Sequence, residues 1–374
     1  MKETKKSIYF YKAECGDAAR IRYLGNDGEY HNIFIDSGYR RTFKNIIARH
    51  INEIQANEEA IDLWIISHIH DDHIGGIEQY LRQIEIGQSI DTVESWFYNS
   101  PRKGNRRIKE DSVNVSGAKS IRQGDILSQY LEAKGKLPEK DIVFGLEPID
   151  FYGMKLFILS PNLNKLERLR EKYESDPELP FERQEGETIS EAKAVVQDDY
   201  HINLKDFNLS EWKEDNSIEN GSSISVLSEY NGFRVLWLAD SHPSDIIDSL
   251  RKLGYSESNK IRCEWVKVTH HGSKANNSNE LYSLIECKNY VFSANGMNKH
   301  KLPTKESVAR IIRNEHRDVE IPYNLYFTYD NEVLRSIFSR ESDNIFKELN
   351  FNVHFQKEGD FLLTTITERT LKYK

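Results

Sequence analysis

A short run of histidines and aspartates directly after an apolar segment constrains this chain more than any other feature. Residues 65–76 read Ile-Ile-Ser-His-Ile-His-Asp-Asp-His-Ile-Gly-Gly, and apolar residues then recur at helical spacing as far as Ile84. The pattern predicts a buried strand, a polar turn and a helix. Desolvated imidazole and carboxylate groups need partners, and a divalent transition metal is a partner for all of them at once.

The spacing inside this run divides its donors between two metal positions. His68 and His70 are two residues apart in an extended segment and project to the same side. Asp72 and His73 follow where the chain begins to turn, so they can face a second ion a few ångströms away. The competing interpretation is a solvated polar loop, and three histidines and an aspartate within six residues are too ordered for it.

Composition places the chain among soluble globular proteins. It has 374 residues, of which 38% are hydrophobic and 30% charged, and we expect one hydrolase domain over residues 1–374. We expect no membrane span, because no apolar run approaches the roughly 20 residues that a bilayer requires. The charged start lacks the apolar core of a secretory signal, so we expect a cytoplasmic protein. Cys15, Cys263 and Cys287 are widely spaced and are predicted to be free thiols.

Hydrophobic patterning predicts alternating strands and helices. Strands are expected at residues 8–11, 19–23, 30–35, 92–98 and 153–161, and helices at 42–57 and 120–135. Within residues 162–219, Leu163, Leu166 and Leu169 suggest a short helix. Glu, Asp, Pro and Lys dominate after it, with few apolar anchors, which is typical of an insertion or lid. His201 lies in that stretch and is either an exposed loop histidine or a late metal ligand. Residues 316–374 are interpreted as completion of the fold or a partner surface.

Two further motifs follow strand ends in the second half of the chain. Residues 224–240 predict a hairpin that turns at Asn231-Gly232 and ends, after an apolar strand, in Asp240. Residues 265–269 predict a strand that leads into His270 and His271. Carboxylate and imidazole groups at strand ends suit the same metal as the first motif.

The combined motifs resemble the metallo-β-lactamase superfamily. His-x-His-x-Asp-His carries the resemblance, which implies an αββα sandwich, an α/β fold, with a mononuclear or dinuclear metal site on its edge. Further motifs narrow the resemblance within the superfamily, namely Asn-x-Ser-Ser at 220–223, Leu-Ala-Asp at 238–240, His-His-Gly-Ser at 270–273 and Ser-Ala-Asn-Gly at 293–296. They look like the hydrolase domain of competence-type DNA-uptake channel proteins and like bacterial phosphorylcholine esterases. The resemblance covers roughly residues 7 to 315, apart from the insertion.

The resemblance implies roles for individual residues. Asp240 would bridge two divalent ions, with zinc favoured over manganese or iron. Asp36, at the end of an early strand, is either a support beneath the site or a plain turn aspartate. His300 is either a ligand or proton donor or a solvent-exposed residue. The expected metal ligands are His68, His70, Asp72, His73, Asp240 and His270 or His271, and the expected catalytic residues are Asp72, Asp240 and His300.

One position departs from the superfamily pattern. Most members have a third histidine for the first metal where this chain has Asn220, which is a poor ligand for such an ion. The first metal would then rest on His68, His70 and Asp240, unless His201 or one of the paired histidines joins them.

Hydrolysis is the expected reaction, and a phosphodiester of nucleic acid or a nucleotide is the favoured substrate. The resemblance supports it, together with a basic Gly/Pro-containing loop. Its candidate substrate-binding residues are Arg102, Lys103, Arg106 and Arg107, followed by Lys109, with Asn220 as a further candidate. The net charge of −9 excludes a generally cationic nucleic-acid-coating surface. The alternatives are a solvated loop, a small-molecule lactonase or esterase, and a non-catalytic subunit that requires a protein partner.

Overall fold

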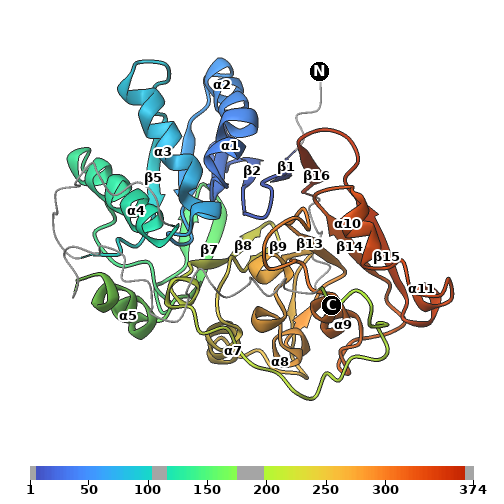
Figure 1. Cartoon of the computed structure of the whole chain (residues 1–374). Coiled ribbons are helices and arrows are strands. Elements are labelled where there is room, and N and C mark those ends of the chain that lie inside the picture. The colour runs from blue at the N-terminus through green and yellow to red at the C-terminus, as the bar shows by residue number, and fades with distance from the viewer. Residues whose placement is uncertain (1–5, 103–115, 175–197, 367–374) are drawn as a thin grey trace, which may run out of the picture.

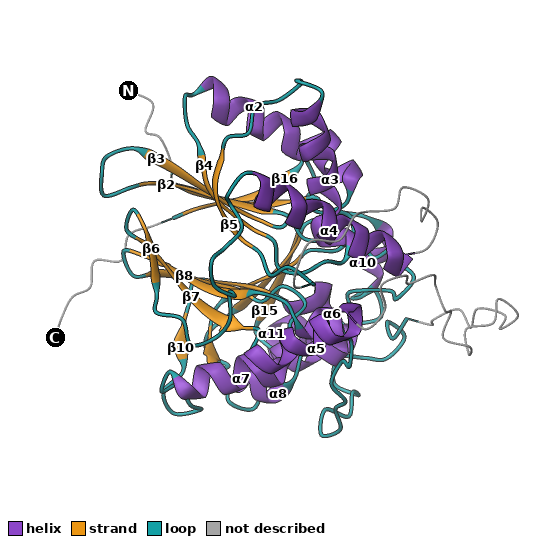
Figure 2. Cartoon of the chain, turned by 90° about the vertical axis from the view of Figure 1, so that its left-hand side faces the viewer, coloured by secondary structure: helices purple, strands orange, loops and turns teal. Residues whose placement is uncertain are grey.

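Two β-sheets pack face to face, and helices cover the outer face of each (Figure 1, Figure 2). This computed structural model describes residues 6–102, 116–174 and 198–366. The arrangement confirms the expected αββα sandwich. A buried apolar layer that includes Ile33, Leu63, Val226 and Val235 lies between the two sheets.

The first sheet begins as an antiparallel meander and continues with parallel strands. Its order is β16-β1-β2-β3-β4-β5, where β1 is Ser7–Tyr11, β2 Ala19–Leu24, β3 Tyr30–Ile35, β4 Ile61–Ile65, β5 Val93–Phe97 and β16 Phe361–Thr365. The strand β4 is buried along its whole length, as a central parallel strand must be. Figure 1 shows β16, from the end of the chain, beside β1.

The second sheet has the order β15-β14-β13-β11-β9-β8-β7-β6. Its strands are β6 Ile149–Phe151, β7 Met154–Ser160, β8 Ser225–Tyr230, β9 Phe233–Trp237, β11 Trp265–Lys267, β13 Asn289–Phe292, β14 Tyr323–Phe327 and β15 Phe351–Phe355. The strands from β9 to β15 run parallel to one another. A separate pair joins β10 (Ile261–Arg262) to β12 (Ile285–Glu286). Residues 316–366 thus supply β14 and β15 to this sheet and β16 to the first.

Helices with one apolar face cover each sheet. Over the first sheet lie α1 (Arg40–Thr42), the π-helical turn η1 (Phe43–Ile47), α2 (Ala48–Ala56), α3 (Asp71–Glu85) and α4 (Ser116–Ala133). Over the second lie α7 (Pro243–Lys252), α8 (Asn279–Ser283), α9 (Lys305–Ile312), α10 (Glu332–Ser336) and α11 (Ile345–Glu348). The helix expected at 42–57 therefore begins two residues earlier, at Arg40, and contains a π-helical turn at Phe43–Ile47. No helix in the described residues is long and apolar enough to cross a membrane.

The stretch at 162–219 is better anchored than its composition predicts. Its first part forms α5 (Leu163–Glu174), which buries Leu166, Leu169 and Tyr173 against the helices of the first sheet. Residues 198–217 bury Tyr200, Leu204 and Phe207 in the core over the second sheet. A few apolar side chains at the right spacing are enough to hold a charged segment in place. The short helix expected from Leu163, Leu166 and Leu169 is confirmed as α5. The expectation of few buried anchors after it is wrong for residues 198–217, and residues 175–197 lie outside the described part of the chain.

Candidate metal centre

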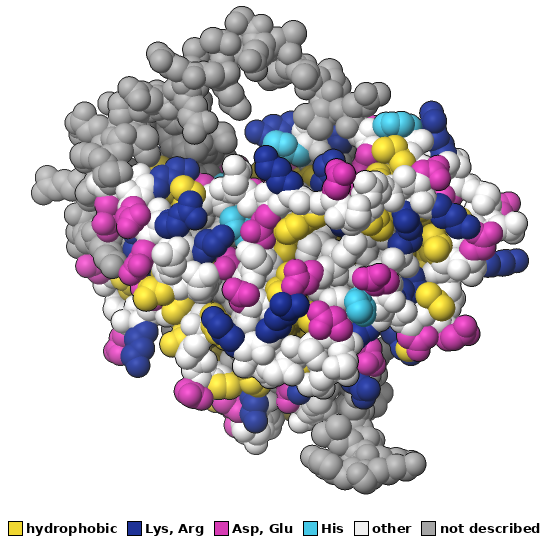
Figure 3. All heavy atoms as spheres, turned by 90° about the horizontal axis from the view of Figure 1, so that it is seen from below, with side chains coloured by type: hydrophobic (Ala, Val, Ile, Leu, Met, Phe, Trp, Pro, Cys, Tyr) yellow, Lys and Arg dark blue, Asp and Glu magenta, His cyan; other side chains and the backbone are white. Residues whose placement is uncertain are grey.

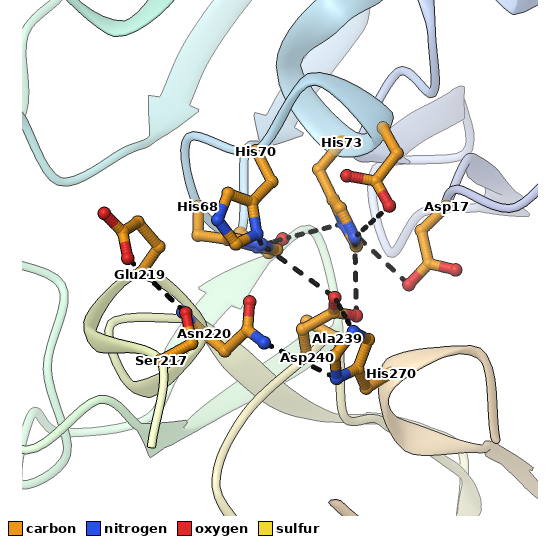
Figure 4. Close-up of polar contacts among 12 residues, drawn as sticks. Asp17, His68, His70, His73, Ser217, Glu219, Asn220, Ala239, Asp240 and His270 are labelled. Carbon is orange, nitrogen blue, oxygen red and sulfur yellow. Dashed lines mark hydrogen bonds and ion pairs between the residues drawn. The ribbon is translucent and has the colours of Figure 1, made fainter. Parts of the chain in front are cut away.

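The carboxyl ends of parallel strands from both sheets meet at one edge of the sandwich, and the motif residues gather there. The segment after β4 runs through His68 and His70 into α3. Asp240 follows β9, and the 3-10 turn η2 (Thr269–Gly272) after β11 carries the paired histidines. Figure 4 shows His68, His73 and His270 converging on Asp240.

One group of four donor atoms surrounds a point next to Asp240. The Nε2 atoms of His73 and His271 lie 3.3 and 3.5 Å from Oδ1 of Asp240. The Nε2 atom of His271 also lies 3.3 Å from Oδ2 of Asp72. Donors bonded to one tetrahedral zinc ion at about 2.0–2.1 Å are roughly 3.3 Å apart. The spacing of Asp72, His73, Asp240 and His271 therefore fits a single ion.

A second group uses the other oxygen of Asp240. The Nε2 atom of His68 lies 3.1 Å from Nδ1 of His70 and 4.0 Å from Oδ2 of Asp240. These three residues form a separate cluster of potential ligands. The Nε2 atom of His270 approaches the same oxygen, at 3.5 Å. Asp240 thus presents one carboxylate oxygen to each group, which is the geometry of a bridging ligand.

The inner atoms of this cluster have unused hydrogen-bonding capacity. Among the described residues, Nε2 of His73, Nε2 of His271 and both carboxylate oxygens of Asp240 are buried and have no hydrogen-bond partner. Each such atom costs free energy unless something compensates it. Imidazole nitrogens and carboxylates are good ligands of transition metals. The residues present therefore fit divalent cations at this position.

Hydrogen bonds on the opposite ring nitrogens orient the imidazoles. The Nδ1 atom of His73 bonds to Asp36, at 2.8 Å. That of His271 bonds to the Ser293 carbonyl, at 3.0 Å, and that of His270 to Oδ1 of Asn276, at 2.7 Å. An acceptor at Nδ1 keeps the proton there, so that Nε2 presents its lone pair to the centre.

Asp36 lies directly beneath the centre and is fully buried. Besides His73, its carboxylate accepts hydrogen bonds from the backbone N–H and the hydroxyl of Ser67, at 2.7 and 2.8 Å. This position agrees with the support role and not with a plain turn aspartate. Asp36 couples the end of β3 to the motif segment after β4.

Sequence reasoning missed a buried ion pair in the same layer. Asp17, in the turn after β1, pairs with Lys267 of β11, and its Oδ1 lies 3.4 Å from Nδ1 of His271. Gly16 allows this turn to approach α3, since a Cβ atom there would lie 2.0 Å from the Asp72 carbonyl oxygen. The sequence feature that could have indicated this ion pair is Lys267, a charged residue within an otherwise apolar predicted strand.

The electrostatics show that the cluster attracts positive charge. Burial alone would lower the pKa of His73, but Asp240, Asp36 and Asp72 raise it well above its usual value. Burial would likewise lower the pKa of His271, and Asp240 and Asp17 outweigh it. The reverse holds for Asp240, since burial would raise its pKa and the neighbouring histidines hold it well below the usual range. A metal cation would balance the same negative charge of the carboxylates as these protons do.

Backbone strain is concentrated around the centre. Asp36, Ala239, His270 and His271 all have φ between 44° and 54°, a left-handed conformation that non-glycine residues rarely adopt. Such residues cost on the order of 1–3 kcal/mol each and persist only where the surroundings hold them. In η2 the strain turns both adjacent histidines inward, toward different oxygens of Asp240.

The other predicted site residues lie around this cluster. Asn220, in the short helix α6 (Ile218–Gly221), is buried and donates to Asp215 at 2.6 Å, with the same nitrogen 3.4 Å from His270. His300 is exposed, and partial desolvation, followed by the charge of Lys299, lowers its pKa below the usual value. His201 is exposed and belongs to none of the ligand clusters among the described residues.

The candidate substrate-binding loop is described only at its start. The guanidinium group of Arg102 bonds to Asp125 at 3.1 Å and to the Tyr173 carbonyl at 2.6 Å. These contacts fix Arg102 between α4 and α5 instead of leaving its charge for a ligand. Lys103, Arg106, Arg107 and Lys109 lie outside the described residues.

Comparison with known proteins supports the family resemblance. Residues 26–145 match the metallo-beta-lactamase superfamily. This match spans β3, β4 and the His-x-His-x-Asp-His motif. No protein among the curated sequences matches the chain. The competence-type and phosphorylcholine esterase subgroups are not confirmed.

Two solved structures resemble the fold at a distance. A mutant of the CmlA beta-hydroxylase is 12% identical, with a TM-score of 0.41, covering 98% of this chain and 55% of that one. CmlA itself, a diiron beta-hydroxylase from Streptomyces venezuelae, is 13% identical, with a TM-score of 0.40, covering 97% and 54%. The chain spans about half the length of these proteins.

Proposed function

We propose that this chain, of which residues 26–145 match the metallo-beta-lactamase superfamily, is a hydrolase that holds two divalent transition-metal ions. The carrying observation is Asp240. Its two buried oxygens have no hydrogen-bond partner in the part of the chain that the structure describes, and they face separate groups of imidazole and carboxylate donors. Asp72, His73 and His271 would hold one ion. His68 and His70 would hold the other, and His270 would take the place of the histidine absent at Asn220.

The donor set suits zinc best, with manganese and iron as alternatives. Bound there, the two ions supply an activated water near neutral pH and stabilise negative charge on a substrate oxygen. Asp240 would fix the distance between the two groups of ligands. Asp72 would lie between its own group and the substrate. His300 would exchange a proton with the leaving group. Asn220 lies beside His270, and its buried side-chain carbonyl oxygen has no partner within the described residues.

A phosphodiester of nucleic acid or a nucleotide is the proposed substrate. The support is the set of motifs shared with competence-type hydrolase domains and the basic residues Lys103, Arg106 and Arg107. Guanidinium groups match phosphate oxygens in geometry. On the face seen in Figure 3, cationic and anionic side chains are interspersed and neither sign covers the surface. A polyanion would therefore be held locally at a basic loop and not across that face.

A lactonase or esterase acting on a small molecule is the second candidate. The observation that favours it is Arg102, whose charge is already paired with Asp125. If the remaining basic residues are also paired or solvated, nothing selects a polyanion, and the metal chemistry serves carbonyl esters equally. A partner-activated subunit is the third candidate, since Asn220 stands where a histidine is usual.

Metal analysis tests the centre itself. We expect the purified protein to carry close to two transition-metal ions per chain by mass spectrometry. Exchanging Asp72 and His73 together for alanine should remove the ion of that group. The matched control exchanges the exposed Asp248 of α7 for asparagine and should leave the metal content unchanged. Equal metal content in the double variant and the wild type would refute the assignment.

A substrate panel tests the reaction. DNA, RNA, bis-p-nitrophenyl phosphate and a lactone are offered with added zinc or manganese. We expect phosphodiester cleavage that falls steeply with salt and is weakened several-fold by Arg106→Ala with Arg107→Ala. The control pair, Arg251→Ala with Lys252→Ala, removes equal charge at the far end of α7 and should have little effect. Lactone cleavage alone would favour the small-molecule hydrolase, and no cleavage without another protein would favour the partner-activated subunit.

A further inference from the structure

Two of the three cysteines, far apart in the sequence, lie side by side in the fold. The strands β10 and β12 run parallel with Ile261 opposite Ile285 and Arg262 opposite Glu286. The next pair in this register is Cys263 and Cys287. The N–H of Cys263 donates to the carbonyl of Glu286, at 3.1 Å, which continues the ladder up to this pair.

This register brings the two thiols within reach of each other. Neighbouring strands are about 4.7–4.9 Å apart, and side chains at paired positions point to the same face. Disulfides form between residues whose Cα atoms are about 4.4–6.8 Å apart. Burial, followed by a hydrogen bond with the Cys287 thiol, raises the pKa of the Cys263 thiol well above its usual value. The two thiols are therefore close to each other.

The pair borders a surface cleft. Cys263 and Cys287 both line this cleft, which has a volume of about 550 Å³. Lys260, Lys288 and Arg317 line it as well, and the β10 side of this region lies at the lower left of Figure 2. The two cysteines are only 5% and 3% exposed, so a reagent would reach them from this cleft after a small local opening.

The third cysteine has a different environment. The Cys15 thiol bonds to Oδ1 of Asn295, at 2.7 Å, and lies in the turn that carries Asp17 beneath the metal centre. The cleft lies at the opposite end of β11, since Cys263 precedes that strand and the paired histidines follow it. Cys15 is therefore an internal control for the other two.

We propose that Cys263 and Cys287 form a dithiol site that closes to a disulfide by exchange with a low-molecular-weight disulfide such as oxidised glutathione. The thiolate of one cysteine attacks the reagent and releases one small thiol, which leaves a mixed disulfide on the protein. The neighbouring cysteine then attacks that mixed disulfide and releases the second small thiol. The protein loses two electrons and two protons, and the reagent gains them as two thiols. A reducing dithiol reverses the exchange.

Thiol counting and peptide mapping on the folded full chain test the site. After native treatment with oxidised glutathione, we expect the titratable thiols to fall from three to one per chain, with one peptide linked through Cys263 and Cys287. Dithiothreitol should restore all three, and metal content should not change. Three remaining thiols, glutathione on both cysteines, or a link to Cys15 would each overturn the proposal.

Single variants separate the two steps. Cys15→Ser should still form the link and lose both of its thiols. Cys263→Ser should stop at a stable glutathione adduct on Cys287, and an unmodified Cys287 there would rule out the stepwise exchange. Phenylarsine oxide, which bridges adjacent thiols, should protect two thiols in the wild type and none in Cys263→Ser. Because these readouts do not depend on hydrolysis, they are independent of the proposed function.

Discussion

The Nε2 atom of His73 lies 3.3 Å from Oδ1 of Asp240, although the two residues come from opposite halves of the sandwich. His73 lies in the first turn of α3, which covers the first sheet, and Asp240 follows β9 of the second sheet. The contact is buried, and neither atom has a hydrogen-bond partner among the described residues. Buried polar atoms of this kind cost free energy unless something compensates them, and cations bound at the centre would do so.

Replacing the bridging carboxylate tests this relationship. We expect Asp240→Asn to fold and to lose at least about a hundredfold in hydrolytic activity, the scale on which loss of one charge-stabilising group acts. An amide keeps the shape but cannot neutralise two cations. The measurements are circular dichroism, metal content and turnover, with Asp248→Asn as the control. Wild-type turnover in a folded Asp240→Asn protein would exclude the bridging role.

Weakening the support beneath His73 should act on metal affinity first. Asn can adopt the left-handed conformation of Asp36, so Asp36→Asn changes the charge with little backbone strain. We expect metal affinity to fall about 10–100-fold, as measured by competition with a chromogenic chelator. Activity at saturating metal should recover most of its wild-type value. Unchanged affinity would mean that Asp36 only stabilises the fold.

The paired histidines should be separable by metal stoichiometry. His271→Gln removes a donor from the group with Asp72, and His270→Gln removes the atom that faces the other oxygen of Asp240. We expect each variant to lose one ion and to retain the other, with zinc counted by mass spectrometry after dialysis. If only His271→Gln loses zinc, His270 is not a metal ligand, and its role is limited to contact with the substrate.

A buried carboxyl away from the ligands gives a pH-dependent prediction. Burial raises the pKa of Asp245 to about 6, and the residue lies in the first turn of α7. A raised folded pKa favours the neutral form, so the folded state loses stability as pH rises from about 4 to 6, and the loss is complete above that range. Asp245→Asn should therefore stabilise the metal-free protein at pH 7 and have little effect at pH 4.

The expected gain for Asp245→Asn is about 1 kcal/mol, because the lost ion pair with Lys165, at 3.7 Å, offsets part of the roughly 3 kcal/mol that two pKa units represent. Urea unfolding at several pH values measures it. The control is the exposed Glu332 in the first turn of α10, since Glu332→Gln removes one carboxylate on another helix and should give little gain at pH 7. A gain for Asp245→Asn that is equal at pH 4 and pH 7 would contradict the raised pKa.

The sequence by itself determined the local parts of this protein. Apolar periodicity located the strand, turn and helix around residues 65–76 and the strands that end in Asp240 and His270, because these signals need only neighbouring residues. The identities of the candidate donors followed from the same motifs, and the αββα fold was confirmed. The anchoring of residues 198–217 was underestimated, because the contribution of a few scattered apolar residues depends on the surface that they cover.

Only the tertiary structure decided which distant residues meet. The left-handed turn at His270 and His271 directs the two rings to different oxygens of Asp240, and no local pattern encodes that backbone conformation. The pairing of Asp17 with Lys267 depends on how the two sheets pack. The meeting of Cys263 and Cys287 depends on strand register, which is fixed when the whole sheet assembles and not by the spacing of cysteines along the chain.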